Sequence, residues 1–199
     1  MSLYTMSQLR QKAELISFYE KRAQFKSASS ILLEDFRGFS EYKTYDIFMS
    51  HSFWDAKQIL ALKIDIEKMG FSVYVDWAED LQLNRSKVTK DTADLLRSRM
   101  KNCISLFFAT SKTSTESKWM PWELGYFDGT KNKVAILPVL DIEQITNQYR
   151  GQEYLGLYPY VAKNKEQNTG KETLLIHEDE DAYINLKEWM QGSKPKRHR

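Results

Sequence analysis

The stretch SKWMPWELGYFDG, residues 117–129, combines one glutamate with aromatic side chains at helical spacing. Trp119 lies four residues before Glu123, so on a helix the two side chains share one face. Pro121 lacks an N–H, which a helix tolerates only in its first turn, so the helix should begin within a few residues before it. Glu123 then lies near the positive end of the helix dipole, which favours an ionised carboxylate. Such a carboxylate beside an aromatic wall suits a cation, as an anionic stabiliser or a nucleophile.

The same residues also have a purely structural interpretation. Trp119 and Trp122 would be anchors of the core, and Glu123 would be a solvated residue at the helix start. An isolated W-x-x-x-E pattern is short and favours this second interpretation, so the surrounding elements must decide between the two.

Apolar runs alternate with helical patterns from Tyr45 onward, which is typical of an α/β fold with a doubly wound parallel sheet. We predict strands at residues 45–50, 71–77, 103–110 and 134–140, with YDIFMS and CISLFFAT in the centre of the sheet. Ligands of such folds bind at the carboxyl ends of the strands, near the point where the strand order reverses. The predicted crevice is lined by Ser50, His51, Asp76, Trp77, Thr110, Ser111 and the loop before Glu123.

The remaining segments divide the chain into three predicted parts. Residues 1–43 are an amphipathic N-terminal helix and linker, residues 44–192 the main domain, and residues 193–199 a basic, disordered tail. The helix either packs on the domain or pairs with another subunit. Beyond Leu140 we expect an edge strand at 155–161, an extended run at 173–177 that ends in an exposed His177, and a closing helix at 182–191.

Composition excludes several classes of function. The net charge of +2, from 29 basic and 27 acidic side chains, provides no strong field to recruit nucleic acid or an anionic membrane. Cys103 is the single cysteine, which excludes an internal disulfide and a cysteine-rich zinc site and fits a reducing cytoplasm. No signal peptide or apolar run of ~20 residues is present. Glycine-rich nucleotide motifs and clustered histidines are also absent, so we expect no metal and no bound cofactor.

Three segments, in this order and spacing, resemble the Toll/interleukin-1 receptor (TIR) domain family, and especially the prokaryotic TIR-like proteins of antiphage defence. They are YDIFMSHS, FSVYVDWAED and SKWMPWELGYFDG. The resemblance is continuous from about Tyr45 to Leu140 and implies a flavodoxin-like sheet of order 2-1-3-4-5. It also implies an assembly loop after the second strand, here Ala78 to Ser86. This loop lacks the glycine and proline often found in animal signalling TIR loops.

The resemblance also implies an activity. In catalytic members a glutamate four residues after a tryptophan, on the third helix, cleaves the N-glycosidic bond of NAD+, and Trp119 and Glu123 match that pair. Breaking this bond gives the ribose oxocarbenium character, which a carboxylate stabilises as in glycoside hydrolysis. Nicotinamide leaves as a neutral group, so an ionised Glu123 needs no general acid beside it. The expected products are nicotinamide and either ADP-ribose or a cyclic ADP-ribose signal.

Further residues receive secondary roles from their places after the strands. Ser50 and His51 are placed to contact ribose or phosphate, and Trp77 or Trp119 to stack on a ring. Asp76 and Asp80 either order the assembly loop, approach a ribose hydroxyl or only form turns. Arg85 meets a phosphate or a neighbouring subunit, and by hypothesis Asp80 and Arg85 contribute to self-association through TIR domains. A downstream effector that senses the product is the other expected partner.

Two other classes of function stay open at this point. One is a non-catalytic TIR adaptor that acts through assembly, and the other is an enzyme like the nucleoside deoxyribosyltransferases, which also depends on a glutamate. A nicotinamide-release assay separates NAD+ cleavage from both alternatives.

Overall fold

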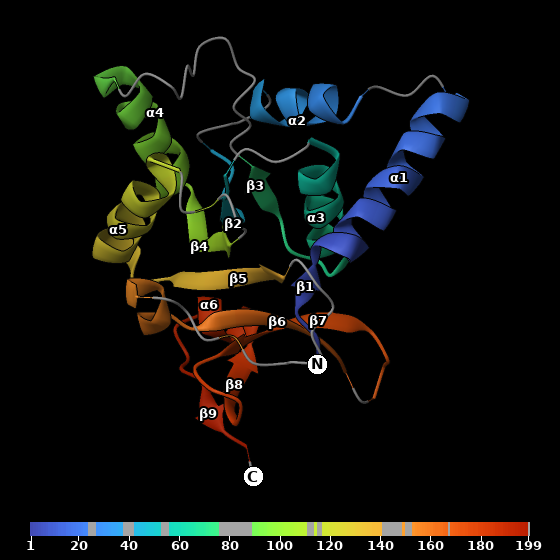
Figure 1. Ribbon diagram of the computed structural model, residues 1–199. Coiled ribbons are helices and arrows are strands. Elements are labelled where there is room, and N and C mark those ends of the chain that lie inside the picture. Colours follow the sequence, from blue (N-terminus) through green and yellow to red (C-terminus); the bar gives the residue numbers. More distant parts are fainter. Residues whose placement is uncertain are drawn as a thin grey trace.

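The computed structural model describes residues 1–23, 27–37, 42–52, 56–75, 89–110, 114, 117–140, 149, 153–166 and 168–198. Its described strands form one sheet in the order β3-β2-β4-β5-β6-β7-β8-β9, and β1 pairs with β5 outside this path. Helices cover the parallel part of the sheet, and the C-terminal strands extend it on the other side of β5 (Figure 1). No helix within the described ranges is long and apolar enough to cross a membrane.

The parallel part of the sheet confirms the prediction from the apolar runs. It consists of β2 (Tyr45–Ser50), β3 (Val73–Val75), β4 (Cys103–Thr110) and β5 (Val134–Leu140). Neighbouring strands within this set all pair in parallel. These runs are mostly apolar because helices bury both faces of the sheet, so no face calls for a regular alternation of polar residues.

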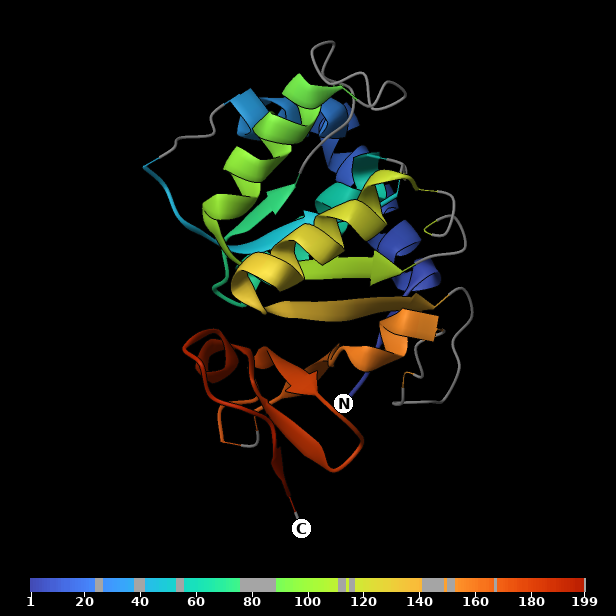
Figure 2. The same ribbon diagram turned by 90° about the vertical axis from the view of Figure 1, so that its left-hand side faces the viewer.

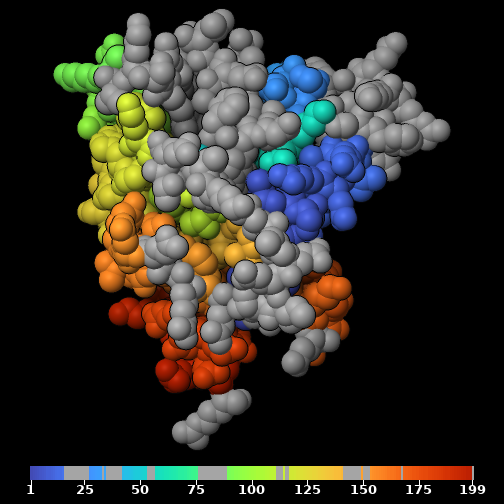
Figure 3. Space-filling view, viewed as in Figure 1, coloured from blue at the N-terminus to red at the C-terminus, as the bar shows by residue number. Residues whose placement is uncertain are grey.

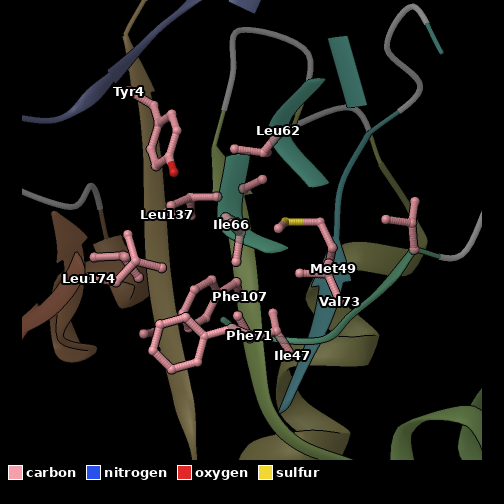
Figure 4. Close-up of a cluster of buried hydrophobic side chains, with 14 of the residues drawn as sticks. Tyr4, Ile47, Met49, Leu62, Ile66, Phe71, Val73, Phe107, Leu137 and Leu174 are labelled. Atoms are coloured by element: carbon pink, nitrogen blue, oxygen red, sulfur yellow. The ribbon is translucent and has the colours of Figure 1, made fainter. Parts of the chain in front are cut away.

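Three helices connect these strands: α3 (Ala56–Lys68), α4 (Lys90–Lys101) and α5 (Trp119–Lys131). Helices α4 and α5 lie in front of the sheet in Figure 2, and α3 lies behind it. On the α3 side, Ile47, Met49 and Phe107 pack against Leu62 and Ile66 (Figure 4). The fold is therefore a three-layer α/β arrangement with one apolar cluster on each face of the sheet.

The N-terminal residues are part of this fold. They form β1 (Tyr4–Thr5), α1 (Met6–Ala23) and α2 (Ala28–Arg37), where the sequence predicted one helix. Leu9 and Leu32 are fully buried in the α3-side cluster. In the space-filling view the dark-blue residues of α1 lie against the teal residues of α3 (Figure 3). The N-terminal helices therefore pack on the domain, which was one of the two alternatives. The domain boundary at residue 43 stays a prediction.

The C-terminal third differs most from the sequence prediction. Its elements are η2 (Glu153–Leu157), β6 (Tyr160–Lys165), β7 (Glu172–His177), β8 (Ala182–Asn185), α6 (Leu186–Met190) and β9 (Lys196–Arg197). Strand β6 joins β5 in parallel, and β7, β8 and β9 follow in antiparallel pairs. The order 2-1-3-4-5 corresponds to β3-β2-β4-β5-β6, which is only part of this longer sheet.

Three expectations for the elements of this third are wrong. The segment 155–161 is not an edge strand, because β6 begins only at Tyr160 and is paired on both sides, by β5 and β7. The segment 182–191 begins as a strand and becomes a helix only at Leu186, and the basic tail pairs with β8 through Lys196 and Arg197. Strand pairing overrides the helical pattern of 182–191 because β7 offers an unpaired edge beside it.

His177 is also placed differently from the prediction. It is only 1% exposed. Tyr160 and Tyr183 lie directly opposite it on β6 and β8, and their ring centroids are 5.1 and 5.0 Å from that of His177. Cross-strand partners on one face of a sheet are close enough for such contacts, so pairing buries a residue that the sequence placed at an exposed strand end.

Candidate active site

The end of β2 presents a polar side chain to the face of the sheet that α5 covers. Side chains alternate along a strand, and Ile47 and Met49 accordingly belong to the cluster on the α3 side. Phe48 is fully buried in the cluster on the α5 side, as expected for a core residue. Ser50, two residues later, points to that same side and is 1% exposed.

Helix α5 begins where Pro121 predicts. Trp119 is its first residue, and Pro121 occupies the third helical position, where no intrahelical N–H bond is lost. The Met120 N–H donates to Ser117 Oγ over 3.2 Å, which satisfies one of the remaining N-terminal donors. The helix start is therefore fixed by local sequence, and this start sets the direction in which Glu123 points.

Trp119 and Glu123 lie on the buried face of α5. Trp119 is 5% exposed and Glu123 is not exposed at all. The interpretation of Glu123 as a solvated helix-start residue is therefore wrong. A carboxylate is rarely buried without polar partners, because its desolvation is costly.

Ser50 provides one such partner. Its hydroxyl donates to Glu123 Oε2 over 2.5 Å, and the two residues are 73 positions apart in the sequence. A hydrogen bond to an ionised acceptor is shorter and stronger than a neutral one. The bond joins the carboxyl end of β2 to the second turn of α5, which is the place where a doubly wound fold binds its ligands.

Aromatic rings continue along α5 from the buried face to the surface. Trp119 meets Trp122 edge to face with centroids 5.5 Å apart, and Trp122 stacks on Tyr126 at 5.7 Å. The guanidinium of Arg97 on α4 lies 5.2 Å from the Trp122 ring centre. These contacts fix the orientation of Trp119 beside Glu123.

His51 and Ser52 continue the chain beyond β2 and are both buried. His51 Nδ1 lies 2.7 Å from the carbonyl oxygen of Ser52. His51 directly follows the last residue of β2, so it lies at the carboxyl edge of the sheet.

Tyr149 belongs to the same edge, and sequence reasoning missed it. Its side chain is hydrogen-bonded to that of Thr110 at the end of β4, and its ring centroid lies 6.2 Å from that of Tyr160. Burial raises the pKa of Tyr149, and the bond to Thr110 acts in the opposite direction. The weak pattern after Leu140 gave no indication of this residue, because its partner Thr110 belongs to β4, far earlier in the chain.

The other predicted site residues cannot be placed. Asp76, Trp77, Asp80, Arg85 and the rest of the loop Ala78 to Ser86 lie outside the described residues, as does Ser111. Among the residues that are described, no group of His, Cys, Asp and Glu side chains is arranged to hold a metal ion.

Comparison with known proteins gives two relatives, whereas no family model matches the chain. The chain is 55% identical over 166 residues to a Bacillus cereus (strain MSX-D12) protein named "Probable 3' cyclic ADP-D-ribose synthase ThsB'"; the match covers 83% of this chain and 86% of that protein. It is 34% identical over 85 residues to "Putative cyclic ADP-D-ribose synthase TIR2" of Cytobacillus dafuensis, a match that covers 42% of this chain and 22% of that protein.

Proposed function

This chain belongs to the TIR-domain family of prokaryotic cyclic ADP-D-ribose synthases, and we propose that it cleaves the bond between nicotinamide and ribose in NAD+ and closes the remaining ADP-ribose into a ring. The product of the Bacillus cereus relative is named as the 3′ cyclic form, and at 55% identity we propose the same product here. The signal then serves antiphage defence by activating an effector that senses it.

The proposed reaction is balanced without any co-reactant. The ribose C1–nitrogen bond breaks, and its electron pair leaves with nicotinamide, which becomes neutral. A nucleophilic group of the same ADP-ribose attacks the ribose carbon, forms the new bond and releases a proton. NAD+ thus gives nicotinamide, cyclic ADP-ribose and H+, and capture by water instead of the internal group gives ADP-ribose.

Glu123 is the proposed catalytic carboxylate. The single observation that supports it is its position: a fully buried carboxylate on the Trp119 face of α5, bonded to the carboxyl end of β2. A negative charge held in a site from which water is excluded stabilises the oxocarbenium ion more strongly than in water, and no reorganisation is needed. Trp119 provides the adjoining aromatic surface.

Other assignments complete the proposal. His51, Asp76 and Trp77 contact the substrate, whereas Asp80 and Arg85 belong to the loop through which copies of the chain associate. NAD+ is the substrate and not a resident cofactor, and the reaction takes place in the cytoplasm, where NAD+ is available.

The test compares two identical substitutions at glutamates in different settings. Glu123→Gln keeps the size of the side chain and removes its charge, so nicotinamide release should fall ~10²–10³-fold while the melting temperature changes little. Glu188→Gln, at an exposed position on α6, is the matched control and should leave the rate unchanged.

Mass spectrometry of the products from NAD+ identifies the ring, with authentic cyclic isomers and ADP-ribose as standards. Equal rates for wild type and Glu123→Gln would show that Glu123 is not catalytic. If no form releases nicotinamide, a TIR adaptor is the better interpretation, and if deoxynucleosides exchange their bases, the chain acts as a deoxyribosyltransferase.

A further inference from the structure

Ser50 stands out among the polar residues of the site because the face of the sheet around it is apolar. The apolar cluster on this side of the sheet includes Phe48 on β2, Phe108 on β4, which lies opposite Ser50, and Leu124 and Phe127 on α5. An alanine or a valine at position 50 would continue this apolar surface and would bury no polar side-chain atom. Ser50 instead places a hydroxyl within hydrogen-bond distance of Glu123.

The hydrogen bond that Ser50 donates argues against direct contact with a substrate, whereas its burial does not, because Glu123 is buried to the same degree. Ser50 is 1% exposed, and its hydrogen is directed to Glu123 Oε2 at 2.5 Å. A serine hydroxyl has one hydrogen to donate. In this geometry that hydrogen is used by the carboxylate and is not available to a ribose or phosphate oxygen.

The bond also has the geometry needed to orient a carboxylate. Glu123 projects from a helix, and several rotatable bonds separate its carboxylate from the backbone. Ser50 belongs to β2, a strand paired on both sides by β3 and β4. A short donor on a rigid central strand therefore holds a longer side chain in one rotamer, which is how supporting hydrogen bonds preorganise a catalytic group.

We propose that Ser50 is a positioning residue that holds the Glu123 carboxylate beneath the reacting ribose, and not a substrate ligand. The inference rests on the proposed NAD+ cleavage by Glu123 and assigns a different role to Ser50 than the sequence did. Kinetic measurements distinguish a positioning residue from a substrate ligand, because a residue that acts through the carboxylate affects the transition state more than it affects substrate binding.

The experiment measures kcat and KM for nicotinamide release from NAD+ by Ser50→Ala, Ser50→Thr and a matched control. The control is Ser105→Ala: Ser105 is fully buried on the adjacent strand β4, and its hydroxyl donates to the backbone oxygen of Asp46 over 2.7 Å. Both alanine variants lose one buried serine hydrogen bond, but only one of these bonds ends on the carboxylate. All rates are measured well below the melting temperature of each variant.

For Ser50→Ala we expect kcat to fall about 10–10²-fold, with KM within about threefold of wild type. Ser105→Ala should keep both constants close to wild type. Ser50→Thr retains the donor and should recover most of kcat. An unchanged kcat in Ser50→Ala, an equal loss of kcat in Ser105→Ala, or a rise in KM at constant kcat would each overturn the inference, the last in favour of a substrate ligand.

The test of Ser50 and the test of the proposed function can fail independently of each other. If Glu123→Gln retains nicotinamide release, the catalytic assignment fails whatever Ser50 does. If Glu123→Gln abolishes release while Ser50→Ala is fully active, only the positioning role fails.

Discussion

The parallel part of the sheet and its antiparallel extension bury polar side chains in different ways. In the parallel part, Ser50 from β2 meets Glu123 from α5 across 73 residues of sequence. In the extension, His177 is held between Tyr160 and Tyr183, its direct partners on the neighbouring strands. One contact joins distant segments at a sheet edge, and the other repeats local strand pairing.

Topology explains the difference. Parallel strands all end at the same edge, so polar residues that follow several strands converge there with the helices that leave that edge. Antiparallel strands end at alternating edges, and their side chains meet mainly the residues directly opposite. The same sheet thus joins residues from distant segments in its parallel part and forms a packed aromatic ladder in its antiparallel part.

The largest expected effect concerns Cys103, at the start of β4 in the parallel part. Burial raises the pKa of this thiol to about 12. At pH 8 the thiolate fraction is then on the order of 10³-fold lower than for a thiol of ordinary pKa, so reaction with a thiol reagent in the folded protein should be slowed at least that much. Labelling kinetics with and without urea measure this protection.

The same labelling tests whether the two parts unfold together. The replacement Trp189→Ala destabilises the antiparallel extension. If the two parts unfold cooperatively, the rate of Cys103 labelling should rise together with the unfolding of the extension. Protection that stays complete while the extension unfolds would show that the two parts are separate folding units. Rapid labelling of the native wild type would contradict the buried position of Cys103.

A smaller effect is expected from paired tryptophan substitutions. Trp119 on α5 is 5% exposed and Trp189 on α6 is 6% exposed, so each replacement by alanine should cost about 3–5 kcal/mol of unfolding free energy. Only Trp119→Ala should also lower nicotinamide release, by roughly 10–10²-fold, because it removes a surface for ring stacking. Denaturant titration and kinetics on the folded fraction measure the two effects.

Similar activity losses in both tryptophan variants would mean that general destabilisation, and not contact with the substrate, explains the effect at Trp119. Full activity in Trp119→Ala would remove this residue from the proposed site.

The smallest effect is the pH dependence contributed by His177. Burial lowers the pKa of His177, and its hydrogen bond to the Asp179 carbonyl and the nearby Asp179 charge act in the opposite direction. The unfolded chain has an ordinary histidine pKa of about 6.5 and takes up the proton first as the pH falls. The stability from a neutral His177 is therefore present above about pH 6.5 and lost progressively below it, down to the lower pKa of the folded state.

Replacement by glutamine tests this contribution. In His177→Gln the free energy of unfolding should fall less steeply with acid below pH 6.5 than in wild type, while nicotinamide release at neutral pH stays the same. Equal slopes for the two proteins would show that His177 does not titrate differently on folding. A loss of activity would connect the extension to the site and break the comparison.

Elements whose signals are local could be predicted from the amino-acid sequence. Continuous apolar runs gave the bounds of β2, β4 and β5, and Pro121 located the start of α5, because both depend on residues within a few positions. The spacing of Trp119 and Glu123 placed them on one helix face for the same reason. These features also carried the resemblance to the TIR family, which the relatives support.

Which of these residues meet, and what they are buried against, depends on the way the elements pack in three dimensions. The bond from Ser50 to Glu123, the packing of α1 and α2 on the domain, and the burial of His177 depend on register and topology, which no local pattern specifies. The helical pattern of 182–191 yielded to the free edge of β7 because pairing with a long-range partner outweighed a weak local preference. The same local sequence would allow Glu123 to be a solvated surface residue, and it is the packing of α5 against the sheet that buries this carboxylate.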